Sequence, residues 1–361
     1  MTAVFRVDFS DTIGIGHLFR CLTLANALHQ KGISCVFISR SDDTNSLIAK
    51  AGHQLVRLNG KETINTDAEV KHASWLSTGW QQDAEESLGI CKKYKSLMLI
   101  VDHYALDYKW EKVLTDYCKI IVVLDDLADR KHNCQLLIDS NYLRRADEYR
   151  KLLVKDSEVL AGSEYTLLKP DFTVLRAKAE HQRKATDTIK KVLVFLGGGN
   201  TENTMASVLS ALSQVSWPVQ PQITVVLSSL YKHVDQVVDR LSEMVFETKL
   251  MIDTPEMARL ILNADLAVGA SGSSTWERCC LGLPSVNILI ANNQQYAHKN
   301  LGGAGVIEAV KAEEPLEKAI ATSVQVLVSD MKKWHSISER CFSLIDGLGT
   351  RRVVSRILSY S

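Results

Sequence analysis

Short apolar runs alternate with longer helical patterns along the whole chain, and this alternation limits the fold more than any other feature. Runs without a polar residue, such as Leu-Met-Leu-Ile-Val at 97–101, are typical of strands covered on both faces, as in parallel sheets. Strands that alternate with helices imply right-handed crossovers and hence doubly wound α/β sheets. The strands that we expect cover residues 4–9, 35–40, 55–58, 97–102, 120–125, 136–139, 192–196, 222–227, 249–252, 266–269 and 285–290. The first helix is predicted from an apolar stripe at helical spacing, made of Leu18, Cys21, Leu22, Ala25 and Leu28.

The length of 361 residues indicates two domains, because a domain usually has roughly 150 residues. Residues 169–191 are charged and poor in strand formers, so we expect them to link the two domains. Each half begins with a strand that enters a glycine-rich turn, which predicts two Rossmann-like domains facing a cleft. We therefore expect an N-terminal domain over residues 1–170 and a C-terminal domain over residues 171–361, with the last helix a candidate to cross back to the first.

Composition argues against several classes of function. The 42 lysines and arginines balance the 42 aspartates and glutamates, so no charge excess points to a nucleic acid or an anionic membrane as partner. None of the eight cysteines forms a Cys-x-x-Cys pair and most lie in or beside apolar runs, so we expect buried thiols in a reducing compartment. The first residues lack the pattern of a signal peptide, and no apolar run approaches the ~18 residues of a membrane span. We expect a cytoplasmic protein without membrane insertion; nothing in the sequence specifies an oligomeric state.

The turn between the first strand and the first helix has the sequence Gly-Ile-Gly-His and ends at His17. Gly14 and Gly16 allow the backbone to approach a ligand, but their spacing is not that of a dinucleotide-binding turn. The positive end of the helix dipole disfavours a charged imidazole, so we expect a neutral His17 ring near neutral pH. A neutral ring at the carboxyl end of a parallel sheet is a candidate general base. A histidine that only bonds to the preceding loop explains the pattern equally well.

Two turns in the second half have the composition of anion-binding loops. Gly198 is the middle of three consecutive glycines in the first turn, and the second is Gly-Ala-Ser-Gly-Ser-Ser-Thr-Trp-Glu at 269–277. Their N–H groups and hydroxyls suit a diphosphate, and Glu277 suits the two hydroxyls of a ribose. The structural alternatives are glycines needed only for the turn and a capping box formed by Ser274 and Glu277. The candidate diphosphate ligands of the second turn are Gly272, Ser273 and Ser274.

Other polar residues follow strands whose ends should meet at the cleft. Asp-His-Tyr, ending at Tyr104, leaves a buried strand at the same sheet edge as the candidate base, and Asn293 follows the strand at 285–290. Arg20 could contact a phosphate, although pairing with one of the aspartates at 125–126 is favoured. Neither His17 nor His103 has a partner at metal-ligand spacing, and there is no His-Glu-x-x-His motif or Cys/His cluster, so we expect no metal and no other cofactor.

The chain carries, in this order, RVDFSDTIGIGHLFRCLTLANAL, IVDHY, VLDDLADRKH, LAGSEYTLLKPDF, FLGGGNTENT and ADLAVGASGSSTWERCCLGLPSVNILIANNQ. In these segments, over about residues 5 to 305, it resembles the family of UDP-2,4-diacetamido-2,4,6-trideoxy-β-L-altropyranose hydrolases of pseudaminic acid biosynthesis. That family is similar in fold to the GT-B glycosyltransferases, so the resemblance implies a GT-B-like arrangement of the two Rossmann-like domains.

The resemblance implies hydrolysis of a UDP-linked diacetamido-trideoxy sugar to UDP and the free sugar, without a metal. It implies that His17 is the catalytic base, that Tyr104 and Asn293 contact the sugar or the attacking water, and that Glu277 binds the ribose. Direct attack of water at C1 would invert the anomeric configuration. The residues expected at the substrate are Gly16, Tyr104, Gly198, Gly272, Ser273, Ser274, Glu277 and Asn293. Departures from the family's common residues are Ile15, Asp129 and Asn200, which bear on substrate preference.

Three alternatives remain at this point. A GT-B glycosyltransferase would use the same base to activate an acceptor hydroxyl instead of water. A hydrolysing sugar 2-epimerase would exchange the hydrogen at C2 during turnover. A protein that only binds a nucleotide sugar would need no base.

Overall fold

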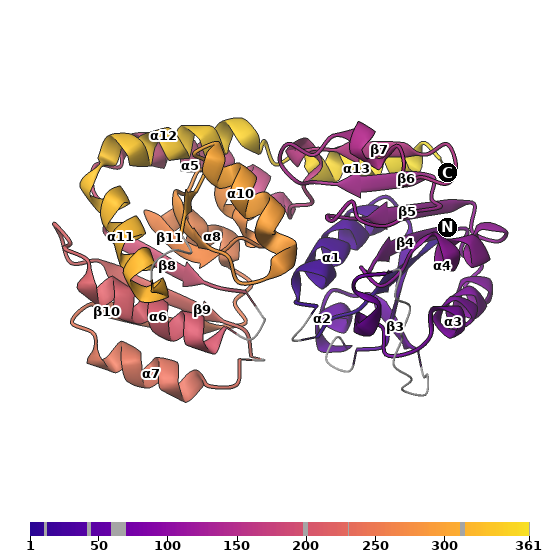
Figure 1. Cartoon of the computed structure of the whole chain (residues 1–361), viewed down its shortest axis with the longest axis horizontal. Coiled ribbons are helices and arrows are strands. Elements are labelled where there is room, and N and C mark those ends of the chain that lie inside the picture. The colour runs from indigo at the N-terminus through magenta and orange to yellow at the C-terminus, as the bar shows by residue number, and fades with distance from the viewer. Residues whose placement is uncertain are drawn as a thin grey trace. The chain divides into compact units, whose positions relative to one another are not determined.

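The computed structural model describes residues 1–10, 13–41, 45–58, 70–197, 201–229, 231–310 and 315–360. The chain forms two compact units, Met1–Leu167 together with Leu348–Ser361, and Leu168–Gly347 (Figure 1). The boundary therefore lies before Leu168 and not after residue 170, and the C-terminal segment belongs to the first unit. Each unit is described separately below.

The first unit is built on a parallel sheet of seven strands in the order β3-β2-β1-β4-β5-β6-β7. β4 (Met98–Asp102) and β5 (Ile120–Leu124) are buried at every residue, as expected for central strands covered on both faces. The order of the strands reverses between β1 and β4, where Val7 and Asp102 are register partners at the carboxyl ends. Ligands of such sheets bind at this switch point. The remaining strands are β1 (Thr2–Val7), β2 (Ser34–Ser39), β3 (Gln54–Arg57), β6 (Leu136–Asp139) and β7 (Glu158–Ala161).

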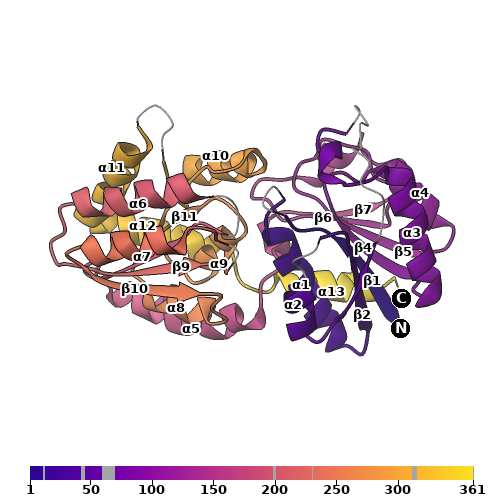
Figure 2. The same ribbon diagram turned by 90° about the horizontal axis from the view of Figure 1, so that it is seen from below.

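Helices cover both faces of this sheet (Figure 2). α1 (Gly16–His29) and α13 (Gly349–Leu358) pack into one buried cluster, and α3 (Trp80–Lys93) and α4 (Tyr108–Thr115) pack into the other. α1 contributes the predicted apolar stripe, every member of which is buried, and α13 contributes Val353, Val354 and Ile357. The C-terminal helix thus completes the core of the first unit. The other helical segments here are α2 (Asn45–Lys50), η1 (Ala73–Trp75), η2 (Ala146–Tyr149) and η3 (Ser163–Tyr165).

The second unit repeats the architecture with six parallel strands in the order β10-β9-β8-β11-β12-β13. β11 (Leu266–Ala270) and β12 (Ser285–Ile288) are its fully buried strands. Both units are therefore doubly wound α/β sheets, which confirms the predicted fold class. The other strands are β8 (Lys191–Phe195), β9 (Gln222–Leu227), β10 (Glu247–Ile252) and β13 (Glu308–Ala309). The helices are α5 (Pro170–Ala185), α6 (Glu202–Gln214), α7 (Val234–Glu243), α8 (Met257–Asn263), α9 (Ser274–Cys280), η4 (Asn292–Gln294), α10 (Gln295–Gly303), α11 (Leu316–Ser329) and α12 (Met331–Leu344).

The expected linker at 169–191 is wrong. Most of it is the helix α5, which packs against α8, α9 and α12 inside the second unit. Pro170 begins this helix, where a missing N–H costs nothing. The inner face of α5 buries Phe172, Ala179 and Arg183. The segment thus packs into the core through this face, although it is highly charged as a whole.

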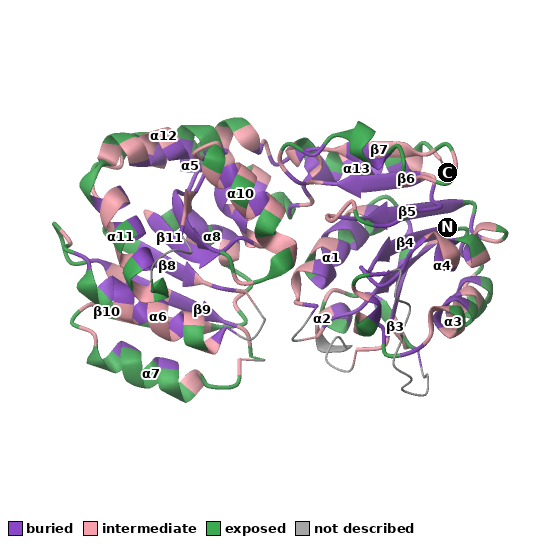
Figure 3. Ribbon diagram, viewed as in Figure 1, coloured by how far each residue is buried: buried purple, intermediate pink, exposed green. Residues whose placement is uncertain are grey.

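Burial follows the sheets and the inward helix faces (Figure 3). All eight cysteines are free and buried, as the sequence predicts. None of the described helices is long and apolar enough to cross a membrane.

Candidate active site

The candidate base lies at the switch point of the first sheet. The chain leaves β1 through a turn in which Gly14 has a φ of +81°, a conformation that favours glycine. The turn ends at Gly16, the first residue of α1, and His17 follows with 6% of its surface exposed. Because β4 ends at Asp102 beside β1, the first turn of α1 brings the imidazole to that carboxylate.

Asp102 holds the His17 ring in one orientation. Its Oδ1 lies 2.6 Å from His17 Nδ1, while Arg20 Nη2 is 3.3 Å from the same ring nitrogen. A guanidinium cannot accept a hydrogen bond, so Nδ1 either donates to the carboxylate or accepts from Arg20. The shorter contact to a charged acceptor favours donation to Asp102. The other ring nitrogen, Nε2, then carries the lone pair, and no described residue hydrogen-bonds to it.

Arg20 keeps that carboxylate ionised. Its Nε and Nη2 lie 2.5 and 2.6 Å from the two oxygens of Asp102. Burial acts to raise the pKa of Asp102, but the charge of Arg20 and the hydrogen bonds from Arg20 and His17 lower it well below its usual range. Arg20 also contacts Asp126 Oδ2 at 2.6 Å, so the predicted pairing with the 125–126 aspartates is confirmed at Asp126. Asp125 instead accepts from Arg130 at 2.7 Å.

Tyr104 lies against the imidazole. Its ring meets the His17 ring edge-on with centroids 4.6 Å apart, and its hydroxyl donates to Asp126 at 2.6 Å. Burial raises the pKa of this phenol well above its usual value, so it stays protonated. The structure thus brings the predicted residue Tyr104 to the base, with its hydroxyl committed to Asp126.

Two aromatic side chains that the sequence did not single out extend this wall. Trp75 and His72 have ring centroids 5.5 and 5.6 Å from that of Tyr104, and 4.5 Å from one another. Both are half-buried and come from the segment around η1. They follow no strand and share no spacing with Tyr104, so no pattern in the sequence could have placed them.

His103, next to Tyr104 in the sequence, belongs to a different network. Its Nδ1 accepts from the N–H of Ala105 at 3.1 Å, and its Nε2 lies 3.2 Å from Asp8 Oδ2. Asp8 also pairs with the fully buried Arg6 at 2.7 Å. Burial lowers the pKa of His103, which favours a neutral ring that stays in the core. This histidine stabilises β1 and β4 and does not extend the candidate site.

The second unit holds the predicted anion-binding turn between β11 and α9. Gly272 is half-buried, and a Cβ at this position would lie 3.4 Å from Gln294 Nε2. Ser273 is exposed and is the N-cap of α9, without a side-chain cap. Because Ser274 is already the first residue of the helix, the alternative of a capping box between Ser274 and Glu277 is wrong. Ser274 accepts instead from Arg278 Nη1 at 3.0 Å.

Glu277 is half-buried, one helical turn into α9. Burial raises the pKa of Glu277 to about 7, although the charges of Lys169 and Arg278 act to lower it. Asn293 lies in η4, beside Gln294, which contacts the turn at Gly272. Gly198 lies outside the described residues, so the first glycine-rich turn remains a prediction.

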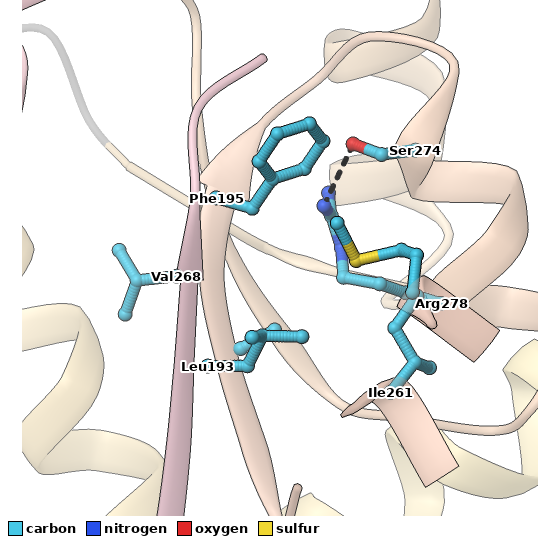
Figure 4. A pocket seen from close by; sticks show the side chains of 8 residues that line it. Leu193, Phe195, Ile261, Val268, Ser274 and Arg278 are labelled. Carbon is cyan, nitrogen blue, oxygen red and sulfur yellow. Dashed lines mark hydrogen bonds between the residues drawn. The ribbon is translucent and has the colours of Figure 1, made fainter. Parts of the chain in front are cut away.

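Buried polar residues support this turn from below. Asn287 in β12 donates to Thr275 Oγ1 at 3.1 Å, and Ser271 Oγ lies 2.7 Å from His298 Nδ1. Figure 4 shows the adjoining pocket, where Phe195, Ser274 and Arg278 come together from β8 and α9. Neither His298 nor Arg278 was expected at the site, because neither carries a recognisable spacing signal.

No group of three or more metal-ligating side chains is placed to hold an ion in the part of the chain that the structure describes. The residues of the first unit that could contact a ligand are aromatic and imidazole groups, and those of the second are small, hydroxyl and carboxyl groups. The first set suits proton transfer beside a sugar ring. The second suits a ribose and phosphates.

No protein-family model matches the chain. Among curated proteins it is 22% identical over 295 residues to the UDP-2,4-diacetamido-2,4,6-trideoxy-β-L-altropyranose hydrolase of Campylobacter jejuni, which covers 82% of this chain and 94% of the relative. It is 24% identical to the spore coat polysaccharide biosynthesis protein SpsG of Bacillus subtilis, over 55% of this chain and 58% of that protein. It is 24% identical to an uncharacterised Methanocaldococcus jannaschii protein, of which it spans only 57%. The match to the Campylobacter hydrolase confirms the resemblance that the motifs indicate.

The similar solved structures establish the fold. Acinetobacter baumannii MurG has a TM-score of 0.69 at 12% identity, with 99% of this chain and all of that chain covered. The spinosyn rhamnosyltransferase SpnG, complexed with thymidine diphosphate, has a TM-score of 0.70 at 14% identity, with 99% of each chain covered. The UDP-GlcNAc 2-epimerase of Neisseria meningitidis has a TM-score of 0.63 at 12% identity, with 99% and 100% covered. The fold is therefore of the GT-B type, which transferases and an epimerase share, and it does not by itself select a reaction.

Proposed function

We propose that the protein hydrolyses a UDP-linked 2,4-diacetamido-2,4,6-trideoxy sugar, with His17 as the base that activates water. The observation that carries the proposal is the 2.6 Å contact between His17 Nδ1 and Asp102, which leaves Nε2 to accept a proton. The sequence similarity to the Campylobacter hydrolase over most of both chains supports the choice of substrate.

The base is supported by an arrangement common to enzymes that deprotonate a hydroxyl or water. An ionised, buried carboxylate orients the imidazole, fixes its tautomer and stabilises the imidazolium that forms when Nε2 takes a proton. Arg20 holds the Asp102 carboxylate through two hydrogen bonds, so the acceptor for Nδ1–H is already in place before substrate binds. Little reorganisation is then needed at the moment of proton transfer.

UDP would be held by the second unit. Gly272, Ser273 and Ser274 would contact the diphosphate, and Glu277 would accept hydrogen bonds from the ribose hydroxyls. Asn293 and Tyr104 would contact the sugar. In the reaction, C1 of the sugar would have to lie within reach of a water bound at His17 Nε2.

The reaction is a displacement at C1. Water loses a proton to His17 Nε2, its oxygen bonds to C1, and the bond from C1 to the UDP oxygen breaks. UDP departs with the bonding electrons, so its leaving requires stabilisation of negative charge more than protonation. The products are UDP and the free sugar with inverted configuration at C1.

The test is to incubate the full-length protein with the UDP-diacetamido sugar in EDTA, without any acceptor, and to follow it by NMR. We expect UDP and, before mutarotation, the sugar in the opposite anomeric configuration. Release of UDP only after addition of an acceptor would indicate a glycosyltransferase. Exchange of the hydrogen at C2 with solvent would indicate an epimerase, and either result would contradict the proposal.

A further inference from the structure

The second unit holds two buried arginines, Arg183 and Arg278, which expose 3% and 2% of their surface. Among the described residues, no carboxylate lies within ion-pair distance of either guanidinium. Burial lowers the pKa of both side chains to about 10, which still leaves them charged at neutral pH. A buried charge without a counter-ion is costly, so each position needs a physical reason.

Arg183 has a structural reason. Its guanidinium donates to the carbonyls of Ile261 at 2.7 Å, Ala264 at 2.6 Å and Leu281 at 3.3 Å. The first two carbonyls belong to the C-terminal end of α8, where the helix dipole is negative. The charge of Arg183 is thus met by helix-end carbonyls.

Arg278 meets no helix C-terminus in the described part of the chain, and although the charge of the neighbouring Glu277 favours its ionisation, the two side chains form no ion pair. It donates to Ala270 O at 2.8 Å, Thr275 Oγ1 at 3.0 Å and Ser274 Oγ at 3.0 Å, all neutral oxygens around the turn between β11 and α9. Its Nε has no hydrogen-bond partner among the described atoms. The positive charge therefore lies directly beneath the turn, beside helix N–H groups that are themselves electropositive.

The surrounding chain is shaped to admit this side chain. A Cβ at Gly269 would lie 2.7 Å from Arg278 Nη1 and equally 2.7 Å from the backbone carbonyl oxygen of Phe195, so a larger residue at this position would collide with both the guanidinium and the neighbouring strand. Figure 4 shows the Arg278 side chain reaching Ser274 across the pocket wall. A buried guanidinium without an ion pair, beneath a turn of hydroxyl and amide groups, indicates a functional constraint.

We propose that Arg278 is a positioning residue for the diphosphate: it fixes the Ser274 hydroxyl and supplies the buried positive charge that the diphosphate neutralises. The inference rests on the proposed function, because it takes the turn at 272–274 as the diphosphate site. Arg278 is too buried to contact the ligand itself. Its effect is electrostatic and conformational, and it acts on the phosphates and not on the nucleoside.

The experiment compares the affinities of the full-length protein for UDP and for uridine by calorimetry. Arg278→Gln should weaken UDP binding by about tenfold or more, since it removes a full positive charge from the poorly solvated region beneath the phosphates, and leave uridine binding nearly unchanged. It should also flatten the dependence of UDP affinity on salt concentration. Arg183→Gln is the matched control: it removes an equally buried guanidinium, so it should lower the melting temperature without changing the ratio of UDP to uridine affinity.

The outcomes separate the two proposals. If the wild-type protein does not prefer UDP to uridine, the proposed function fails. If it does, and Arg278→Gln keeps the same preference, only the role of Arg278 is wrong.

Arg278→Lys covers the case in which the glutamine variant does not fold. A buried lysine loses its proton more readily than arginine, so the preference for UDP should fall between about pH 8 and pH 9 in this variant and stay level in the wild type. The neighbouring carboxyl Glu277 has a pKa of about 7 and is already ionised over this range. A preference independent of pH in the lysine variant would overturn the inference.

Discussion

The two units share an architecture but treat buried charge in opposite ways. In the first unit the arginines face carboxylates: the buried Arg6 contacts Asp83 at 2.8 Å, and the half-buried Arg20 contacts Asp102 at 2.5 Å. In the second unit the buried guanidiniums of Arg183 and Arg278 face carbonyl and hydroxyl oxygens. At the first site the positive side chains are paired with carboxylates in the absence of ligand, whereas the buried guanidiniums of the second unit form no ion pair with a described carboxylate.

This difference indicates that the first unit provides the base and the second binds the anionic part of the substrate. A base must be oriented before the substrate arrives, so its carboxylate and guanidinium partners belong to the protein. A site for an anion gains affinity when its counter-charge is the ligand. Variants in the first unit should therefore change turnover, and variants in the second should change UDP affinity.

The largest effect is expected for His17→Asn. Loss of a general base lowers the rate by about 10²–10⁴-fold, so kcat should fall by that order. UDP affinity should not change, because the proposed UDP contacts lie in the second unit. His29→Asn, at the exposed end of the same helix, is the matched control and should keep full activity. A His17→Asn variant that stays folded but loses UDP binding would break the division between the units.

A similar or smaller loss of rate is expected for Asp102→Asn. The amide cannot stabilise the imidazolium, and its N–H group can hold the ring in the wrong tautomer, so kcat should fall by about 10²–10⁴-fold. Stability should also fall, by about 3 kcal/mol, because one partner of a buried ion pair is removed. Arg20 keeps its contact with Asp126 in this variant, so its charge is not left unpaired. The loss of unfolding free energy should therefore lie at the low end of the usual range. Denaturant unfolding measures the second effect, and unchanged turnover would contradict an orienting role for Asp102.

Much of this arrangement follows from the sequence, for local reasons. The apolar runs identify β4, β5 and β11 because a strand that is buried on both faces is apolar along almost its whole length. β7 and β13 were not predicted. The strand Glu158–Ala161, at the edge of its sheet, mixes charged and apolar residues. The strand Glu308–Ala309 has too few residues to show the alternation of polar and apolar residues that is typical of a strand.

The partners within the site could not be predicted in the same way. His17 and Asp102 are 85 residues apart, and only the pairing of β1 with β4 brings them together. α5 was mistaken for a linker because its many charges mask an inner face that includes the buried Arg183. Arg278 stands beside Glu277 in an ordinary helical sequence, and only the structure distinguishes the buried guanidinium from a surface charge.

The smallest expected effects concern Glu277, whose pKa is raised to about 7 by burial. If the ionised carboxylate accepts the ribose hydroxyls, wild-type UDP affinity should rise as pH increases through about 7. Glu277→Gln cannot ionise, so its UDP affinity should be weaker by a few fold and level across the same range. Calorimetric titrations at about pH 6 and pH 8 make the comparison, with buffer ionisation corrected. Parallel pH profiles for the two proteins would exclude Glu277 as the ribose contact.

The same carboxyl should also affect the stability of the ligand-free protein, in the opposite direction. Its pKa is about 7 in the folded state and near 4.5 when unfolded, so between these values the folded chain binds more protons. Stability from this group is therefore highest below the unfolded pKa and is lost as pH rises to about 7. The stability of Glu277→Gln does not depend on this ionisation. The variant should therefore have a lower melting temperature than the wild type at low pH and a higher one above about pH 7. UDP should reverse this order, because only the wild type offers the ribose a charged acceptor. A variant that is less stable than the wild type at pH 8 without ligand would show that Glu277 supports the fold of α9 and is not held ready for a ligand.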